Sequence, residues 1–352
     1  MRLDDRDNGT LSRRAFLALG GAAVVGAAAW RFGATRQAAA QRGLTGGRFV
    51  AMGTYLELTV PETAGGHVLP AALDAVRRVE ERMSYFLPAS ELSRLNAAAA
   101  GAPVPLSAEL RAVLEAARET HLLTHGSFDP TVPPLLEAWG FREGRPTRVP
   151  SRDDVRAALA RVGLDRLTLA GDTATLNAED MALDLGGIAK GYGADRAAAA
   201  LAAAGQTGLV NAGGDIRAAG PQPDGSPWRI GVRDPLRPDG LLATLELSGA
   251  TAVATSGTYE QYAELDGRRV SHIVDPRSGE TTTGVVSATI LAPTAMQADA
   301  LATACIVLPA AEGLRLLEAL PGVEGLLVRQ RTGGGHAIET TPGLRATMLR
   351  DV

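Results

Sequence analysis

The segment 184–195, with the sequence DLGGIAKGYGAD, constrains the fold of this chain more than any other stretch. The apolar run 181–183 predicts a strand before it, and the alanine-rich run 194–204 predicts a helix after it. Glycines at such a turn let the backbone approach a ligand, and free amides at the start of a helix attract an anion. Lys190 adds a point charge suited to phosphate. A tight turn with a solvated lysine fits the same residues, and the pattern is neither a P-loop nor a Rossmann fingerprint.

Between residue 40 and residue 160 the sequence predicts more helix than strand. Residues 49–60 alternate in polarity and predict one strand. Residues 69–83 and 107–125 place apolar side chains at helical spacing and predict two amphipathic helices. The segment 90–96 between them is typical of a polar turn. The capping-box sequence that begins at Ser151 predicts the start of a third helix.

Short apolar runs separated by turn residues dominate the rest of the chain and predict strands. Helices are expected again at about 295–308 and 310–320. Helices combined with antiparallel strands predict an α+β fold with mixed, mostly antiparallel sheets and packed helices, not a regular βαβ winding. No repeat and no long linker indicates a domain boundary. The predicted strands are 167–169, 174–176, 181–185, 208–210, 228–232, 242–247, 252–254, 260–265, 270–274 and 285–291.

Composition excludes several classes of function. A chain of 352 residues with 45% hydrophobic content can bury one large core or two smaller ones. A net charge of -4 and an aromatic content of 4% give no basis for binding nucleic acid. Cys305 is the sole cysteine, so an internal disulfide and a cysteine-based metal cluster are excluded. Its apolar surroundings in sequence predict a buried, inert thiol.

The N-terminus resembles an export signal. Arg13 and Arg14 stand directly before the apolar run 15–30, which is short for a membrane span of roughly 20 residues. Three alanines at 38–40 suit a signal peptidase, and the whole looks like a twin-arginine signal of a protein exported in the folded state. An uncleaved anchor or a chance arginine pair is the alternative. Residues 1–40 are therefore set apart as a twin-arginine-type signal, which places residues 41–352 in the periplasm or at the outer face of the cytoplasmic membrane.

Two residues on a predicted helix form a candidate metal site. Asp299 and Thr303 are four apart, so their side chains face the same side of a helix. A carboxylate and a hydroxyl are hard oxygen donors suited to Mg²⁺ beside a phosphate. A solvated aspartate and a threonine bonded back to the helix explain the same spacing.

Histidine offers one candidate for proton transfer. His272 lies where a predicted strand meets a turn, and its imidazole could accept a proton near neutral pH. A hydrogen-bonded structural imidazole is the alternative. His121 and His125 are also four apart, but no glutamate follows the first and no third zinc ligand is evident. No serine lies in a G-x-S-x-G motif, so a serine hydrolase has no support.

Nine short motifs follow one another along the chain. They are MGT at 52–54, SELSRLN at 90–96, FDPTV at 128–132, WGF at 139–141, DLGGIAKGYGAD, NAGGDI at 211–216, ATSGTYEQY at 254–262, SHIVDPRSGE at 271–280 and ADALATA at 298–304. Their order closely resembles the ApbE family, the FAD:protein FMN transferases, from about residue 48 to about residue 330. The departures are small: Thr258 stands where an acidic residue is frequent, Ala263 where an aromatic is common, and Ser278 replaces the usual threonine. Many relatives are lipoproteins, and this chain lacks the anchoring cysteine near residue 40.

The resemblance implies one ApbE-like, FAD-binding flavin transferase domain at residues 41–352. It implies that FAD binds as a substrate with its pyrophosphate beside Mg²⁺. The metal ligands implied are the backbone carbonyl of Gly187 and the side chains of Asp299 and Thr303. The positions implied to contact FAD are Met52, Phe86, Ser127, Phe128, Asp129, Asp184, Lys190 and Ile273.

The activity implied is transfer of the FMN part of FAD to a Thr or Ser hydroxyl of an exported acceptor protein, of the flavinylated respiratory or electron-transfer type. Lys190 would stabilise the AMP leaving group, and His272 is the candidate general base, with Asp275 close to it in sequence. Water in place of the hydroxyl would make the chain an FAD diphosphatase that yields FMN and AMP. A flavin-binding protein without turnover is the further alternative.

Overall fold

The computed structural model describes residues 43–347, except 143, 145, 236, 238, 239 and 332–334. The predicted export signal at residues 1–40 lies outside the described residues. Within the described ranges, no helix is both long enough and apolar enough to cross a membrane.

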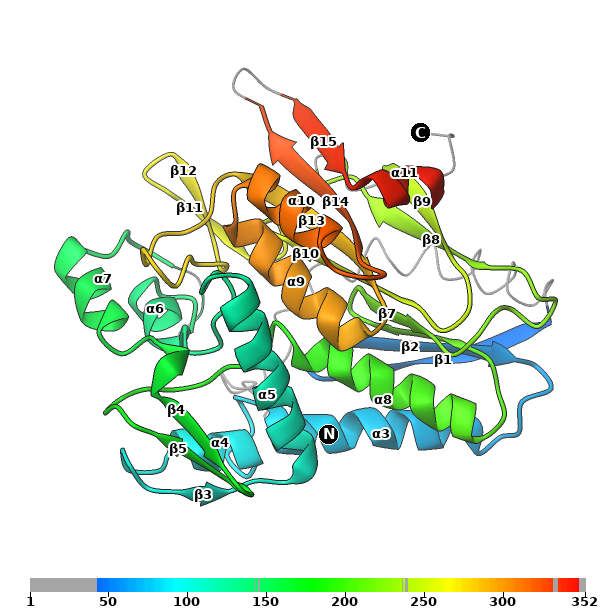
Figure 1. Ribbon diagram of the computed structural model, residues 1–352, viewed down its shortest axis with the longest axis horizontal. Coiled ribbons are helices and arrows are strands. Elements are labelled where there is room, and N and C mark those ends of the chain that lie inside the picture. The colour runs from blue at the N-terminus through cyan, green and yellow to red at the C-terminus, as the bar shows by residue number, and fades with distance from the viewer. Residues whose placement is uncertain are drawn as a thin grey trace, which may run out of the picture.

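An eight-stranded sheet in which all neighbouring strands run antiparallel organises the fold (Figure 1). Its strand order is β1-β2-β6-β7-β10-β13-β14-β15. The α+β prediction is confirmed. The strands are β1 (Leu44–Ala51), β2 (Thr54–Pro61), β6 (Leu209–Ala212), β7 (Asp215–Ala218), β10 (Ala252–Gly257), β13 (Val285–Ala292), β14 (Glu324–Gln330) and β15 (His336–Thr340).

The two faces of this sheet carry different partners. Helices α3 (Val68–Met83), α8 (Ala189–Ala203), α9 (Ala295–Val307) and α10 (Ala310–Glu318) cover one face. The hairpin β8 (Trp228–Arg233) and β9 (Leu241–Leu247) covers the other, together with α11 (Pro342–Thr347). Successive side chains of β10 point to opposite faces of the sheet. Ala252 and Ala254 pack toward the helices, and Val253 packs toward the hairpin.

A smaller lobe lies at the lower left of Figure 1 and packs against α3 and α9. Its helix α5 confirms the prediction at 107–125, and the capping box of Ser151 and Asp154 at the start of α7 is present. The lobe and its neighbours comprise α4 (Glu91–Asn96), β3 (Val104–Pro105), α5 (Ala108–Leu123), α6 (Pro133–Ala138), α7 (Arg152–Leu159), a 3₁₀ turn at Leu164–Arg166, β4 (Leu167–Ala170), β5 (Thr173–Leu176), β11 (Tyr262–Leu265) and β12 (Arg268–Ser271).

The strand predicted at 49–60 is two strands joined by a tight hairpin. Met52 and Gly53 both have positive φ, 51° and 68°, as a two-residue hairpin turn of type I′ requires. Ala51 pairs with Thr54 across the turn. The single-strand prediction was wrong because the alternation of polarity continues on both sides of the turn.

Two predictions near the central segment were also wrong. Residues 90–96 form a short helix, α4, capped by the Ser90 side chain, instead of a turn. Residues 181–185 form no strand, because Leu183 bonds through both backbone groups to the side chain of Asn96, at 2.8 Å each. The backbone groups of an extended segment need partners, and here a side chain supplies them.

Helix α8 begins at Ala189, five residues before the predicted start at 194. Gly191 therefore lies inside the helix and not in the turn. A methyl group on Gly191 would lie 2.2 Å from the carbonyl oxygen of Ala295 at the start of α9. Glycine has a low helix propensity, but here it lets two helix backbones meet, and this packing outweighs the propensity.

Candidate active site

The first turn of α8 carries Lys190 into a group of acidic side chains from two other elements. Its Nζ lies 2.6 Å from Oδ2 of Asp215 on β7 and 3.2 Å from Oδ1 of Asp299 on α9. The Asp299 carboxylate also accepts the backbone N–H of Gly191 at 3.1 Å. Both aspartates are almost fully buried, with 2% and 1% of their surface exposed. Three segments that are remote in sequence thus meet around one ammonium group.

Asp195, one turn further along α8, fixes the position of α9. Its two carboxylate oxygens accept the backbone N–H groups of Ala295 and Met296, at 2.9 Å each. A carboxylate at these free amides satisfies the start of the helix and suits its dipole. Arg217 on β7 lies 3.3 Å from the same carboxylate. Because α9 begins at a fixed point on α8, Asp299 is held against Lys190.

The charges around Lys190 are not balanced. Burial and the charge of Asp299 raise the pKa of Asp215 to about 7, although Lys190 acts in the opposite direction. Burial would lower the pKa of Lys190, but Asp215 and Asp299 outweigh it and raise that pKa, so the lysine is charged. Desolvation raises the pKa of Glu260, whereas the charges of Lys190 and Arg233 lower it. The Glu260 carboxylate in turn raises the pKa of Lys190. The carboxylates of Asp215, Glu260 and Asp299 repel one another, so a further cation at this place would stabilise their charged forms.

The structure brings the three predicted metal ligands to the same place. A methyl group on Gly187 would lie 3.1 Å from Oγ1 of Thr303 and 3.4 Å from the ring of Phe128. Thr303 lies one turn after Asp299 on α9, and its Oγ1 is 3.3 Å from Oγ of Ser256. Among the residues that the structure describes, no group of three or more His, Cys, Asp or Glu side chains could hold a metal ion. A metal here would therefore depend on hydroxyl and carbonyl oxygens as well as a carboxylate.

The loop 126–132 carries three of the predicted FAD positions, and the ring of Phe128 lies at this turn. Ser127 is buried, and its Oγ has no hydrogen-bond partner among the described residues. Phe128 is also buried, and two side chains hold its backbone, one from α5 and one from the residue that ends α5. Thr124 Oγ1 accepts its N–H at 3.1 Å, and Nδ1 of His121 bonds to its carbonyl oxygen at 3.0 Å. His121, set aside as a zinc ligand, thus holds this loop.

Asp129 uses its carboxylate inside the protein. Its Oδ1 accepts the N–H and the hydroxyl of Thr131, at 2.8 and 2.6 Å. Its Oδ2 accepts the N–H of Leu164 at 3.3 Å and lies 3.4 Å from Nδ1 of His121. Burial raises its pKa. In this arrangement Asp129 braces the loop that carries Ser127, and a direct contact between Asp129 and FAD stays a prediction.

The other four predicted FAD positions, Asp184, Met52, Phe86 and Ile273, lie in different environments. Asp184 accepts the N–H of Gly186 at 2.8 Å and pairs with Arg142 at 2.5 Å. Met52 packs at α8, where its Sδ would lie 2.8 Å from a methyl group on Gly193. The Phe86 ring is 75% exposed, whereas Ile273 is buried in the core beside α9.

His272 directly follows β12 and has one ring nitrogen engaged. Its Nδ1 bonds to the carbonyl oxygen of Gln261 at 3.1 Å, so Nδ1 carries the hydrogen and Nε2 keeps its lone pair. Desolvation lowers the pKa of this imidazole, Lys190 lowers it further, and the Gln261 bond and Asp184 act in the opposite direction. The neutral imidazole can therefore accept a proton at Nε2.

Comparison with known proteins decides the family. The ApbE family profile matches residues 52–327, which is well over half of the chain. The chain belongs to the ApbE family. A protein of Vibrio cholerae named FAD:protein FMN transferase is 37% identical over 263 residues, covering 74% of this chain and 79% of that protein. A protein of the same name from Escherichia coli K12 is 31% identical over 269 residues, covering 74% and 75%.

Solved structures of ApbE proteins share the fold. The crystal structure of the ApbE protein from Thermotoga maritima superposes with a TM-score of 0.79 at 34% identity, covering 87% of this chain and all of that one. The flavin transferase ApbE from Vibrio cholerae superposes with a TM-score of 0.79 at 32% identity, covering 86% of this chain and 99% of that one. The α+β fold is therefore that of the ApbE family.

Four residues of this candidate site were not predicted as site residues from the sequence. Asp215 follows a Gly-Gly turn and begins β7. A carboxylate at that position could have been recognised from the sequence as a candidate site residue. Ser256, Glu260 and Arg142 gave no comparable signal, because their neighbours in space come from other segments of the chain.

Cys305, predicted to be inert, is buried, and burial raises the pKa of its thiol to about 12.

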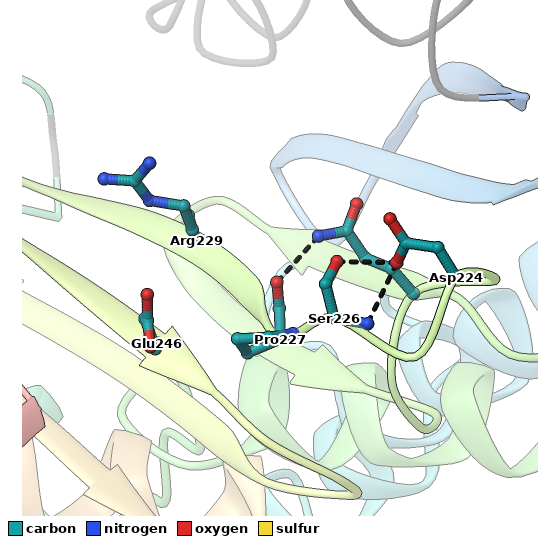
Figure 2. A pocket seen from close by; sticks show the side chains of 6 residues that line it. Asp224, Ser226, Pro227, Arg229 and Glu246 are labelled. Atoms are coloured by element: carbon teal, nitrogen blue, oxygen red, sulfur yellow. Dashed lines mark hydrogen bonds between the residues drawn. The ribbon is translucent and has the colours of Figure 1, made fainter.

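A hollow of about 330 Å³ also lies at the β8–β9 hairpin (Figure 2). Its lining includes Arg229 and Glu246, which face each other across the two strands. Ser226 donates to Asp224 from both its N–H, at 2.9 Å, and its hydroxyl, at 2.6 Å. The hairpin covers the sheet face opposite α8 and α9, so this hollow is separate from the candidate site around Lys190.

Proposed function

We propose that this chain is a Mg²⁺-dependent FAD:protein FMN transferase. It moves the FMN part of FAD onto a Thr or Ser hydroxyl of an exported acceptor protein and releases AMP. The observation that carries the proposal is the meeting of Lys190, Asp215 and Asp299 beside Gly187 and Thr303. The names of the relatives support the same activity.

The residues around Lys190 fit a magnesium ion. The carboxylate of Asp299, the hydroxyl of Thr303 and the backbone carbonyl of Gly187 would hold it, because Mg²⁺ prefers hard oxygen ligands. A cation at this place would also offset the repulsion from Asp299 that contributes to the raised pKa values of Asp215 and Glu260. When bound, Mg²⁺ supplies Lewis-acid stabilisation of charge on a pyrophosphate oxygen.

The same region fits FAD. The Oγ of Ser127 is buried without a partner among the described residues, and a buried polar atom of this kind favours a ligand that bonds to it. The exposed Phe86 ring offers a face on which a planar flavin can stack. Lys190 has three N–H donors and spends two on Asp215 and Asp299, so the third can reach a phosphate oxygen.

In the transfer step His272 acts as the general base and Lys190 stabilises the leaving group. Nε2 of His272 takes the proton from the acceptor hydroxyl as its oxygen attacks the flavin-side phosphorus. A new P–O bond joins FMN to the acceptor, and the P–O bond to the AMP phosphate breaks. Lys190 stabilises the charge that develops on the departing AMP. The products are the flavinylated acceptor and AMP.

Hydrolysis is the competing reaction at the same site. His272 is only half-buried, so water can reach the imidazole and replace the acceptor hydroxyl as nucleophile. The products would then be free FMN and AMP. Exclusion of water by the docked acceptor would decide between the two reactions.

The test is to incubate the chain without residues 1–40 with FAD, Mg²⁺ and a candidate acceptor domain. Flavin fluorescence of the acceptor band in a denaturing gel, together with an added FMN mass and AMP release, is the expected result. AMP release without labelling of any acceptor would favour the diphosphatase. Bound FAD with neither product would leave a flavin-binding protein and overturn the proposal.

The proposed export rests on Arg13 and Arg14. On this proposal the mature chain works in the periplasm or at the outer face of the cytoplasmic membrane, where its acceptor is also exported. Replacing both arginines by lysine in the full chain should retain the protein in the cytoplasm. Unchanged export of that variant would contradict a twin-arginine route.

A further inference from the structure

Arg142 links two walls of the proposed flavin site. It follows the WGF motif, and its Nη2 donates to Oδ2 of Asp184 at 2.5 Å. Its guanidinium carbon lies 3.9 Å from the centre of the Tyr85 ring and 5.7 Å from that of Phe86. The Tyr85 and Phe86 rings meet edge to face, with 5.4 Å between their centres. Arg142 thus contacts the turn before α8 and the loop after α3 together.

Burial makes these contacts strong. The Arg142 side chain is 13% exposed and that of Asp184 is 19% exposed, so solvent screens the ion pair weakly. Nε of Arg142 is buried without a hydrogen-bond partner among the described residues, and the planar group lies over the Tyr85 ring instead. The planar guanidinium of arginine can stack on an aromatic ring and bond to a carboxylate at the same time, whereas lysine offers only a point charge to both.

Side-chain hydroxyls hold the backbone of the loop that carries Tyr85 and Phe86. Ser84 Oγ accepts the N–H groups of Phe86 and Leu87, at 3.2 Å each, and the Ser93 hydroxyl donates to the carbonyl oxygen of Tyr85 at 3.3 Å. The Phe86 ring itself is 75% exposed. Among the described residues, the Arg142 guanidinium is the charged group that lies near both rings and also bonds to Asp184, so it can set the direction of the aromatic pair.

We propose that Arg142 is a positioning residue for the flavin end of the substrate. It holds the Phe86 ring and the Asp184 carboxylate at a fixed separation, so that a planar isoalloxazine can lie on Phe86 beside Asp184. This inference rests on the proposed function, because it assumes that the ring ligand is a flavin. On this proposal Arg142 acts on the flavin end of the substrate and not on the adenosine end.

The chain offers a matched control. Arg269 also combines a stacked ring and a carboxylate, since it lies 4.2 Å from the centre of the Tyr262 ring and 3.2 Å from Glu264. Its side chain is 51% exposed and sits on the β11–β12 hairpin. Arg269→Ala therefore removes the same chemistry at a place without a proposed flavin contact.

The experiment measures binding of FMN and of ADP to wild type, Arg142→Ala, Arg142→Lys and Arg269→Ala, each without residues 1–40. Quenching of flavin fluorescence reports FMN binding, and calorimetry reports ADP binding. Arg142→Ala should weaken FMN binding about tenfold and leave ADP binding unchanged. The FMN affinity of Arg142→Lys should lie between those of wild type and Arg142→Ala, and the FMN affinity of Arg269→Ala should equal that of wild type. In turnover, KM for FAD should rise in Arg142→Ala with little change in kcat.

Unchanged FMN affinity in Arg142→Ala, or an equal loss of FMN and ADP affinity, would overturn the positioning role. FMN binding needs no acceptor and no turnover. If wild type binds FMN but labels no acceptor, the transferase proposal fails while the role of Arg142 is still decided. If wild type binds no flavin, both proposals fail.

Discussion

Asp299 on α9 accepts the backbone N–H of Gly191 on α8 at 3.1 Å, although 108 positions separate the two residues. The bond places the carboxylate at the first turn of α8, where Lys190 also reaches it at 3.2 Å. Two helices that meet backbone to backbone can hold side chains in a fixed relation, because neither helix can shift without a clash. The geometry of the proposed site therefore depends on how closely α8 and α9 approach.

Asp299→Asn should lower transfer about a hundredfold or more and leave the fold intact. The amide oxygen can still accept the Gly191 N–H, whereas the negative charge that would hold Mg²⁺ is lost. AMP release measured across a Mg²⁺ titration, with thermal unfolding followed by circular dichroism, checks both parts. Asp153→Asn, at an exposed carboxylate, is the control. Wild-type turnover of Asp299→Asn at low Mg²⁺ would remove Asp299 from the metal site.

Gly191→Ala should destabilise the protein by about 3 kcal/mol, because the new methyl group meets the Ala295 carbonyl and forces the helices apart. Activity should fall as well, since Asp299 would move away from Lys190. Chemical denaturation gives the free energy of unfolding. Gly66→Ala is the matched control, because a methyl group there meets nothing within 4 Å. Equal stability of the two variants would show that α8 and α9 tolerate separation.

Asp195→Ala should lower the free energy of unfolding by about 3 kcal/mol, because two backbone N–H groups at the start of α9 lose a charged acceptor. The start of α9 should then exchange its amide hydrogens faster, and hydrogen exchange of Ala295 and Met296 measures this. Asp153→Ala, whose carboxylate pairs with Arg156 at an exposed place, should change little. Unchanged exchange in Asp195→Ala would contradict the anchoring role.

The pH dependence of transfer should reflect His272, whose pKa is lowered from its ordinary value of 6.5. The neutral base persists as pH falls below 6.5, so the acid limb of kcat/KM should lie below that pH. The contribution of His272 to the free energy of unfolding is present above pH 6.5 and is lost as pH falls through its lowered pKa. His272→Gln should lose at least about a hundredfold in rate and lack this limb. An acid limb below pH 6.5 that persists in His272→Gln would assign the proton transfer to another group, whereas a limb near pH 7 in both proteins would reflect Asp215.

Sequence periodicity and capping were enough for the local structure of the strongest elements. Helices α3 and α5 and the capping box at Ser151 follow from side chains within one or two turns of each other. The predictions failed where a partner remote in sequence replaced the local signal. Asn96 supplies the hydrogen bonds of Leu183 in place of a neighbouring strand, and the contact with Ala295 lets Gly191 stay inside α8.

The sequence by itself determined the α+β class, the family resemblance, and which residues had the chemistry for phosphate, metal and proton transfer. Those properties depend on side-chain chemistry and on short motifs, so they can be predicted from the sequence without knowing how the chain packs. Only the tertiary structure decided that Lys190 pairs with Asp215 and Asp299, and that Arg142 joins Asp184 to the aromatic loop. Such contacts follow from how distant helices, strands and loops pack, and the packing depends on the whole chain together.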